Sequence, residues 1–448
     1  MKKTLLSLVV GISLSLPVFA DDLSAVYQLA LQNDPVVNRA KAEKELAYSG
    51  IKLSRANLLP QISGAIGYAV SSRDNVDFSE TGINVISSDS DNISMGIDLN
   101  MSLYDHANWI GMDRAEKVAQ QGDANLGAAL QQLIVRTTNA YLSVLREQDN
   151  VEFVKAELRA IERQLEQTKQ RFEVGLTAIT DVHEAQANFD NTVARSIVAE
   201  NTVELRREEL REITGKYHDD IAVLDTKMFS PEKPTPERVD GWLELAKESN
   251  LTLLSQRLAR DVAKEDINAA VAGHFPTLSL NAGLDKNNQT IESRGRETDL
   301  PTLDSSSISL QLNIPIYEGG RTSTNSERAR ANYVIASETL ELTYRQTVRS
   351  VRSSFNAVNA SISTIRALEQ SVVSADSALK ATEAGFDVGT RTIVDVLNST
   401  RNLFDARRNL ADARYNFISA IVSLKGAAGT LTAADLKAIN QVLKPAQA

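Results

Sequence analysis

The chain contains the same succession of sequence signals twice. Residues 171–182 return as residues 385–396, and residues 99–105 return as residues 312–318. Each half shows a helix, a proline, a strand, a polar loop, a strand, a very long helix, a glycine turn and a helix, in that order. A repeat of about 200 residues is too long for a small-repeat solenoid and indicates duplication of a whole structural unit.

The N-terminus has the form of a secretory signal. Lys2 and Lys3 precede an apolar run over residues 5–16, and Ala20 stands directly before Asp21. The apolar run is shorter than the roughly 20 residues that a transmembrane helix needs. We therefore predict cleavage after Ala20, with retention of the segment as an anchor as the alternative.

Composition narrows the class of protein further. The formal net charge is −10, which argues against nucleic acid as a partner. The chain has no cysteine, so disulfides and a lipid-bearing cysteine are excluded. Beyond the signal no run of roughly 18 apolar residues occurs, so no spanning helix is expected. An exported chain of this kind is periplasmic, secreted or an outer-membrane β-barrel.

Four segments alternate between apolar and polar residues with a period of two. This period places one face of a strand in an apolar medium and the other in water. The longer two have about 9–11 residues, which matches a tilted crossing of a hydrocarbon layer about 25 Å thick. A soluble β-sandwich would alternate in the same way and remains open from the strands alone. The four segments are residues 62–70, 93–103, 278–284 and 308–316.

Polar loops are predicted to join the strands of each pair. They cover residues 71–92 and 285–306, which are rich in Ser, Asp and Asn. Tyr104 and Tyr317 end the second strand of each pair, where an interfacial aromatic residue would lie.

Four strands cannot close a barrel by themselves. Open edges in hydrocarbon would leave backbone groups unpaired at a cost of several kcal/mol each. Two chains would supply eight strands and three chains twelve. A barrel of about eight strands is nearly filled by its side chains, whereas a larger one can hold a water-filled lumen. A conduit would therefore need the trimer.

Two very long helices are predicted over residues 105–172 and 318–386, which contain no proline. Their apolar residues recur with coiled-coil spacing, and each stretch would reach roughly 100 Å. A generic coiled-coil rod would explain this spacing but would leave the strands unexplained. The first seam comprises Leu130, Leu133, Thr137, Ala140, Val144, Glu147, Val151, Val154, Leu158, Ile161, Leu165, Thr168 and Phe172, and the second includes Tyr344, Val348, Val351, Phe355, Val358, Ile362, Ile365, Val372, Leu379 and Phe386.

Shorter helices complete each half. Residues 178–215 and 392–428 are predicted to return along the long helices. Asp34 and Pro35 have the form of a cap and first turn, so a further helix is predicted from there to about Leu58, with a counterpart ending near Gly273.

The predicted fold class is α+β, with five segments along the chain. They are a signal peptide (1–20), a first structural repeat (21–215), an equatorial linker (216–240), a second structural repeat (241–428) and a C-terminal equatorial segment (429–448).

The repeated order of strands, helices and glycine turns resembles the outer-membrane efflux protein family of TolC type. The similarity covers essentially the whole mature chain and is most specific in residues 388–397 and 351–356. The resemblance implies a homotrimer in the outer membrane, with a twelve-stranded barrel continued by a coiled-coil tunnel in the periplasm. It further implies an exit duct for drug efflux and type I secretion, served by a periplasmic adaptor and an inner-membrane pump.

Gly175 and Gly389 stand where the long helices end, as expected of C-terminal caps that need a positive φ. The resemblance adds adaptor contact by the residues around them. These tip residues are Val174, Gly175, Leu176, Thr177, Val388, Gly389 and Thr390.

The resemblance also implies a gate. Asp395 matches the family's constriction aspartate, but Asn398 stands where a second aspartate often occurs, so a single acidic ring is expected. Thr180, Asp181 and Arg391 match residues that tie neighbouring helix pairs together in the closed state. Phe386 stands where related chains can have Tyr, so one hydroxyl contact would be missing.

No enzymatic chemistry, cofactor or metal site is predicted. The four histidines are scattered, and no nucleophile or metal-ligand spacing appears. The alternative function is a non-channel trimeric coiled-coil surface protein or adhesin. Transported molecules and specific pumps are not identified by the sequence.

Overall fold

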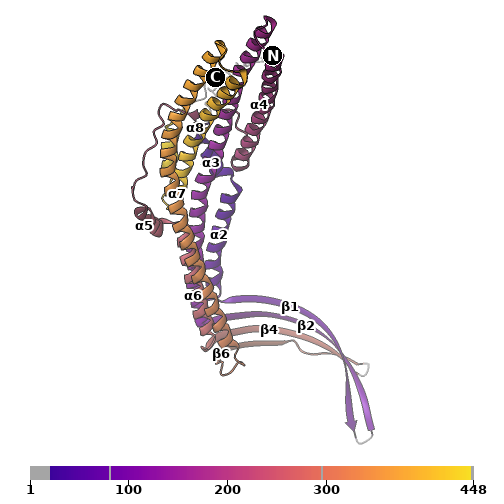
Figure 1. Cartoon of the computed structure of the whole chain (residues 1–448). Coiled ribbons are helices and arrows are strands. Elements are labelled where there is room, and N and C mark those ends of the chain that lie inside the picture. The colour runs from indigo at the N-terminus through magenta and orange to yellow at the C-terminus, as the bar shows by residue number, and fades with distance from the viewer. Residues whose placement is uncertain (1–20, 80–81, 294–295, 445–448) are drawn as a thin grey trace, which may run out of the picture. The chain divides into compact units, whose positions relative to one another are not determined.

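The computed structural model of the protein describes residues 21–79, 82–293 and 296–444 (Figure 1). The predicted signal peptide, residues 1–20, lies outside these residues. The chain divides into two compact units. Unit 1 comprises the chain up to residue 39, residues 127–250 and residues from 346 onward, and unit 2 comprises residues 40–126 and 251–345. Both units draw on both repeats, and the domain boundaries expected from the repeat stay a prediction.

The described residues form helices and strands in an order that occurs twice. The helices are α1 (Leu23–Asn33), α2 (Pro35–Ala56), α3 (His106–Glu173), α4 (Ile179–Thr214), α5 (Val239–Ser249), α6 (Leu251–Ala272), α7 (Arg321–Asp387), α8 (Ile393–Ala427) and α9 (Ala433–Asn440). The strands are β1 (Gln61–Ser79), β2 (Gly82–Tyr104), β3 (Val223–Leu224), β4 (Thr277–Ser293), β5 (Arg296–Asp299), β6 (Leu303–Asn313) and β7 (Leu443–Lys444).

The predicted long helices are confirmed. α3 has 68 residues and α7 has 67, and each ends within one residue of the predicted position. The short helices also begin as predicted, with Pro35 at the first position of α2. Across the described ranges, no helix is both long and apolar enough to cross a membrane.

Unit 2 contains an antiparallel sheet in which β2 pairs with β1 and β4, and β4 also pairs with β5 and β6 (Figure 1). The register places apolar residues opposite one another, for example Ile66 opposite Met95 and Ile97 opposite Leu284. These side chains are exposed in the single chain. The predicted apolar face is therefore present, and it is continuous from strand to strand.

The prediction of a polar loop over residues 71–92 is wrong. β1 continues to Ser79 and β2 begins at Gly82, so most of this stretch is a paired hairpin. Backbone ladders do not require apolar side chains, and serines can bond across the strands, as Ser71 Oγ and Ser90 Oγ do at 2.8 Å. Alternating apolar residues in this stretch, among them Phe78 opposite Ile83, were the overlooked strand signal.

The prediction of a second polar loop, over residues 285–306, is wrong for the same reason. β4 continues to Ser293, β5 pairs with its end, and β6 begins at Leu303. The last predicted strand ends early, because β6 stops at Asn313 rather than at residue 316. Pro315 accounts for this end, since proline has no amide hydrogen to donate to a ladder.

Unit 1 is held together by the predicted seams. On α3, Leu133, Val144 and Ile161 are buried, and on α7 Val351 and Ile365 are buried. The last residues of the two seams differ in burial, because Phe172 is 40% exposed and Phe386 is 8% exposed. The heptad pattern therefore identifies the core of the helices but not the contrast between their ends.

Asp34 connects three helices of unit 1. It ends α1, accepts a hydrogen bond from the Val37 amide in the first turn of α2 at 2.8 Å, and pairs with both terminal nitrogens of Arg136 on α3 at 3.0 Å. Its side chain is 1% exposed. Burial alone would raise the pKa of this carboxyl, but the Arg136 and Val37 bonds outweigh it and leave the pKa lowered.

We expect Asp34→Asn to lower the free energy of unfolding by roughly 2 kcal/mol, because asparagine keeps the helix cap but loses the charged pair. Since the folded pKa is depressed, the pair contributes above the unfolded pKa and is lost as pH falls through the folded value. Thermal unfolding of both proteins should therefore differ near neutral pH and converge in acid. Glu45→Gln, at an exposed position of α2, is the matched control. Equal melting at neutral pH would contradict the role of the pair.

Asp149 on α3 and Tyr415 on α8 form a second polar contact in unit 1. The Tyr415 hydroxyl donates to Asp149 Oδ2 at 2.6 Å, and Tyr415 is fully buried. Burial raises the pKa of Asp149, although the Tyr415 bond and Arg414 act in the opposite direction. Asp412 and Glu152 add to the increase. Folding therefore disfavours the ionised form of Asp149 relative to the unfolded chain.

Asp149→Asn should raise the melting temperature near neutral pH, because the amide oxygen accepts the Tyr415 bond without a buried charge. A raised folded pKa means that the wild type gains stability as pH falls, so the difference between the two proteins should shrink from about pH 7 towards about pH 4. Melting curves over this range test the sign. Glu162→Gln, at an exposed position of α3, should melt like the wild type throughout. A difference that grows in acid would refute this account.

Candidate functional site at the hairpin tips

The turn between α3 and α4 is built by Gly175. Its φ of 76° lies in the left-handed region, and its amide donates to the Phe172 carbonyl at 2.9 Å. The Leu176 amide donates to the Arg171 carbonyl at 2.8 Å. These two bonds form a Schellman motif, which satisfies carbonyls at the end of a helix. The predicted cap is confirmed.

The second copy repeats this geometry between α7 and α8. Gly389 has a φ of 81° and donates to the Phe386 carbonyl at 3.0 Å, and Thr390 donates to the Gly385 carbonyl at 2.8 Å. Val388 is exposed beside it, as are Val174 and Leu176 in the first copy. Both tips therefore present apolar side chains to solvent, and adaptor contact by the predicted residues stays a prediction.

Asp395 is the third residue of α8 and belongs to a capping box with Thr392. Its Oδ2 accepts from the Thr392 amide at 2.9 Å and from the Thr392 hydroxyl at 3.0 Å, while its own amide donates to Thr392 Oγ1 at 3.2 Å. The bonds from Thr392 lower the pKa of Asp395, and nearby Arg391 adds to this. The carboxylate is therefore oriented by the helix cap and stays charged at neutral pH.

Asp181 occupies the corresponding position of α4 but has a different partner. Its carboxylate accepts a hydrogen bond from the Thr177 hydroxyl, and its amide donates to the Ala178 carbonyl at 3.1 Å. Ala178 cannot cap the helix with its side chain, whereas Thr392 does so in the second copy. The two aspartates are thus equivalent in sequence but held in different ways.

The remaining predicted gate residues are Thr180, Arg391, Phe386 and Asn398. In the described part of the chain no hydrogen bond or ion pair joins Asp181 to Arg391. Thr180 and Asn398 are exposed, and Arg391 is exposed beside Gly385. Phe386 is buried among Ile161, Ile393, Val396 and Leu397, together with the partly buried Phe189 and Leu379.

Sequence reasoning missed Arg171, the residue that contacts Phe386 from the first hairpin. The Arg171 guanidinium carbon lies 4.6 Å from the centre of the Phe386 ring, and Arg171 Nη1 lies 3.8 Å from Asp387 Oδ1. One signal was available, because position 171 corresponds to Gly385 in the second copy. At this position the first repeat has a long cationic side chain and the second repeat has a glycine.

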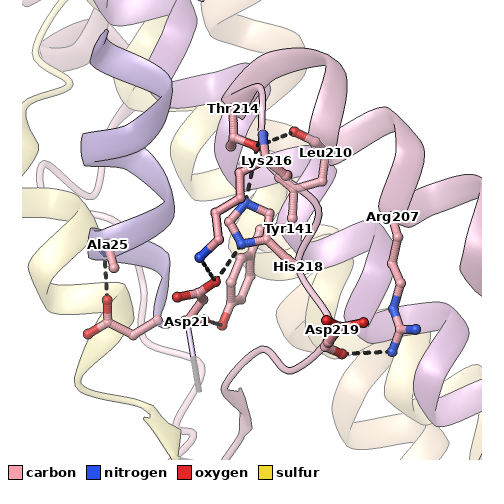
Figure 2. A network of polar contacts seen from close by, with 10 residues as sticks. Asp21, Ala25, Tyr141, Arg207, Leu210, Thr214, Lys216, His218 and Asp219 are labelled. Carbon is pink, nitrogen blue, oxygen red and sulfur yellow. Dashed lines mark hydrogen bonds and ion pairs between the residues drawn. The ribbon is translucent and has the colours of Figure 1, made fainter. Parts of the chain in front are cut away.

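An Asp–His–Thr arrangement lies elsewhere in unit 1 (Figure 2). His218 Nδ1 lies 2.7 Å from Asp21 Oδ2, and His218 Nε2 lies 3.0 Å from Thr214 Oγ1. The order of groups is that of a hydrolytic triad, but Thr214 is 0% exposed and its hydroxyl bonds to backbone carbonyls of Leu210 and Lys216. The hydroxyl is therefore shielded from solvent, and the network ties the segment before α1 to the end of α4.

Comparison with known proteins agrees with this architecture. A family model described as outer membrane efflux protein matches residues 26–216 and 242–430. The chain is 44% identical to outer membrane protein TolC of Vibrio cholerae over 97% of each chain. It is 29% identical to the alkaline protease secretion protein AprF of Pseudomonas aeruginosa, covering 94% of this chain and 87% of the relative. A crystal structure of CusC covers 92% of this chain and 93% of its own, with a TM-score of 0.77 at 16% identity.

The fold is that of outer-membrane channel proteins, with long helix hairpins and a sheet that has an apolar face. The chain belongs to the outer membrane efflux protein family, and it is an outer-membrane protein.

Proposed function

We propose that the chain is the protomer of a homotrimeric exit duct that passes drugs or proteins across the outer membrane. An inner-membrane pump and a periplasmic adaptor deliver the cargo to a tunnel formed by the helix hairpins. Membership of the outer membrane efflux protein family supports this function. The family consists of channel proteins, and the proposal assigns no chemical reaction to the chain.

The observation that carries the proposal is the open sheet of unit 2. Within the described ranges, β1 pairs only with β2 and β6 pairs only with β4, so each has one edge without a neighbouring strand. Exposed edges beside an apolar face are unstable in hydrocarbon. Pairing β1 of one copy with β6 of the next removes both edges.

The number of chains in the proposed duct follows from the need for a lumen wide enough to pass cargo. The long strands β1, β2, β4 and β6 give eight from two chains and twelve from three. Side chains nearly fill a barrel of about eight strands, so a conduit needs the larger one. A second copy alone would seal the edges without leaving a path for cargo.

The gate of this duct is formed at the tips by Asp395, Asp181, Thr180 and Arg391. Three-fold symmetry gathers three copies of Asp395 around one axis, and the capping box orients them. Asn398, which carries no charge, leaves a single acidic ring. The adaptor contacts the exposed tips around Gly175 and Gly389.

Planar-bilayer recording of the purified protein tests the duct and the acidic ring together. The wild type should form trimers with a single-channel current that multivalent cations block. Asp395→Ala should abolish most of this block, because it removes the charge from the axis. Thr392→Ala separates the charge from its orientation, because it keeps the carboxylate and the bond from the residue 392 amide, and it should weaken the block less than Asp395→Ala does. A trimer without current would identify a non-channel surface protein. Unchanged block in Asp395→Ala would exclude the acidic ring.

Arg391→Ser should raise the single-channel conductance, because the proposed gate uses this guanidinium to tie neighbouring helix pairs. A charge-assisted contact with Asp181 on a neighbouring hairpin provides the physical basis. An exposed pair contributes only about 0–1 kcal/mol, so a partial rather than complete opening is expected. Arg391→Lys keeps the charge and should conduct nearly like the wild type. Equal conductance of the serine variant and the wild type would remove Arg391 from the gate.

A further inference from the structure

We propose that Arg171 is a positioning residue of the gate, which holds the end of α3 on the end of α7 and thereby stabilises the closed duct. The inference rests on the proposed function and adds a contact that lies inside one chain. It concerns the last turn of α7, residues 385–387, where side chains from both hairpins meet.

The first argument is the geometry of the contact. The Arg171 guanidinium carbon lies 4.6 Å from the Phe386 ring centre, within the range of a cation–π interaction. Arg171 Nη1 is 3.8 Å from Asp387 Oδ1, so the next residue of α7 adds an ion pair. Asp387 is well exposed, and an exposed pair contributes little by itself. Stacking on Phe386 is therefore the main part of the contact.

The second argument is burial. Phe386 is 8% exposed and packs with Ile161 of α3 and with Ile393, Val396 and Leu397 of α8. Arg171 Nε is buried and has no hydrogen-bond partner, so this side chain is not placed by a complete set of hydrogen bonds. A flat guanidinium over the aromatic ring explains the position, because arginine adds planar stacking to the cation–π attraction that an ammonium would also have.

The third argument is the difference between the repeats. Phe172 corresponds to Phe386, and Arg171 corresponds to Gly385. Phe172 is 40% exposed, so the first tip lacks the cover that Arg171 provides for the second. The contact from α3 to α7 therefore has no equivalent from α7 to α3, because Gly385 stands at the position that corresponds to Arg171.

Gly385 also determines where the other arginine lies. A Cβ atom at this position would stand 2.8 Å from Arg391 Cγ, which is closer than real contacts allow. The absence of a side chain at residue 385 therefore lets Arg391, in the turn between α7 and α8, lie against the end of α7. Arg171 and Arg391 both contact the last turn of α7, and loosening that turn affects the gate residue directly.

The test is single-channel recording of purified trimers in planar bilayers. Arg171→Ala should conduct more than the wild type, because the end of α7 loses its contact with α3. Arg171→Lys should fall between the two, since it keeps the ion pair but not the stacking. Arg163→Ala, an exposed arginine two turns earlier on α3, is the matched control and should conduct like the wild type. Wild-type conductance in Arg171→Ala would overturn the proposal.

Phe386→Leu provides a second variant that keeps an apolar side chain at this buried position but removes the aromatic face. It should raise conductance as Arg171→Ala does, and combining both changes should add nothing further. Additive effects of the two changes would show that Arg171 acts without Phe386 and would overturn the stacking contact.

Hydrogen exchange gives a readout that does not depend on current. Amides of residues 385–391 should exchange roughly two- to five-fold faster in Arg171→Ala than in the wild type, as loss of one cation–π contact implies. If the wild type carries no current but the exchange difference is present, the duct is refuted and the contact stands. If current is present and exchange is unchanged, the Arg171 contact is refuted and the duct stands.

Discussion

The structure of unit 2 depends on the need of every strand to pair its backbone on both edges. β1 and β6 each have one strand neighbour within the described residues, so one edge of each strand is left without a strand partner in the single chain. The sheet has a continuous apolar face, with Ile97 opposite Leu284. In hydrocarbon an unpaired strand edge is especially unfavourable, because no water is present to hydrogen-bond the free backbone groups. In the proposed trimer, neighbouring copies pair these edges, and the resulting twelve-stranded barrel encloses the lumen.

The tips of unit 1 show how one architecture supports two different roles. Both long helices end in the same glycine-based motif, so the repeat reproduces the backbone. The side chains differ at the positions that matter for contact: Arg171 against Gly385, and Ala178 against Thr392. The first hairpin contributes a cation to the second, while the second caps its own helix and orients Asp395. The contacts of the proposed gate are therefore concentrated where the two repeats differ in sequence.

Much of the fold could be predicted because its signals are local. The absence of proline and the heptad spacing were sufficient for α3 and α7, and glycines at positive φ marked both caps. The strands extend further into residues 71–92 than predicted, because serine and aspartate are typical of loops although backbone pairing does not depend on them. The cap formed by Thr392 and Asp395 was also within reach, since the two are three residues apart.

Periodicity and turn chemistry along the chain define the elements, the apolar face of the strands and the buried seams, since each depends on neighbours a few residues away. Contacts between distant segments could not be obtained in this way. Three such contacts join residues far apart in the sequence. They are the stacking of Arg171 on Phe386, the pairing of Asp34 with Arg136 and the bond between the buried His218 and Asp21. Their partners are selected by how the helices pack, because a side chain finds a distant ring or carboxylate only when the backbone brings the two together.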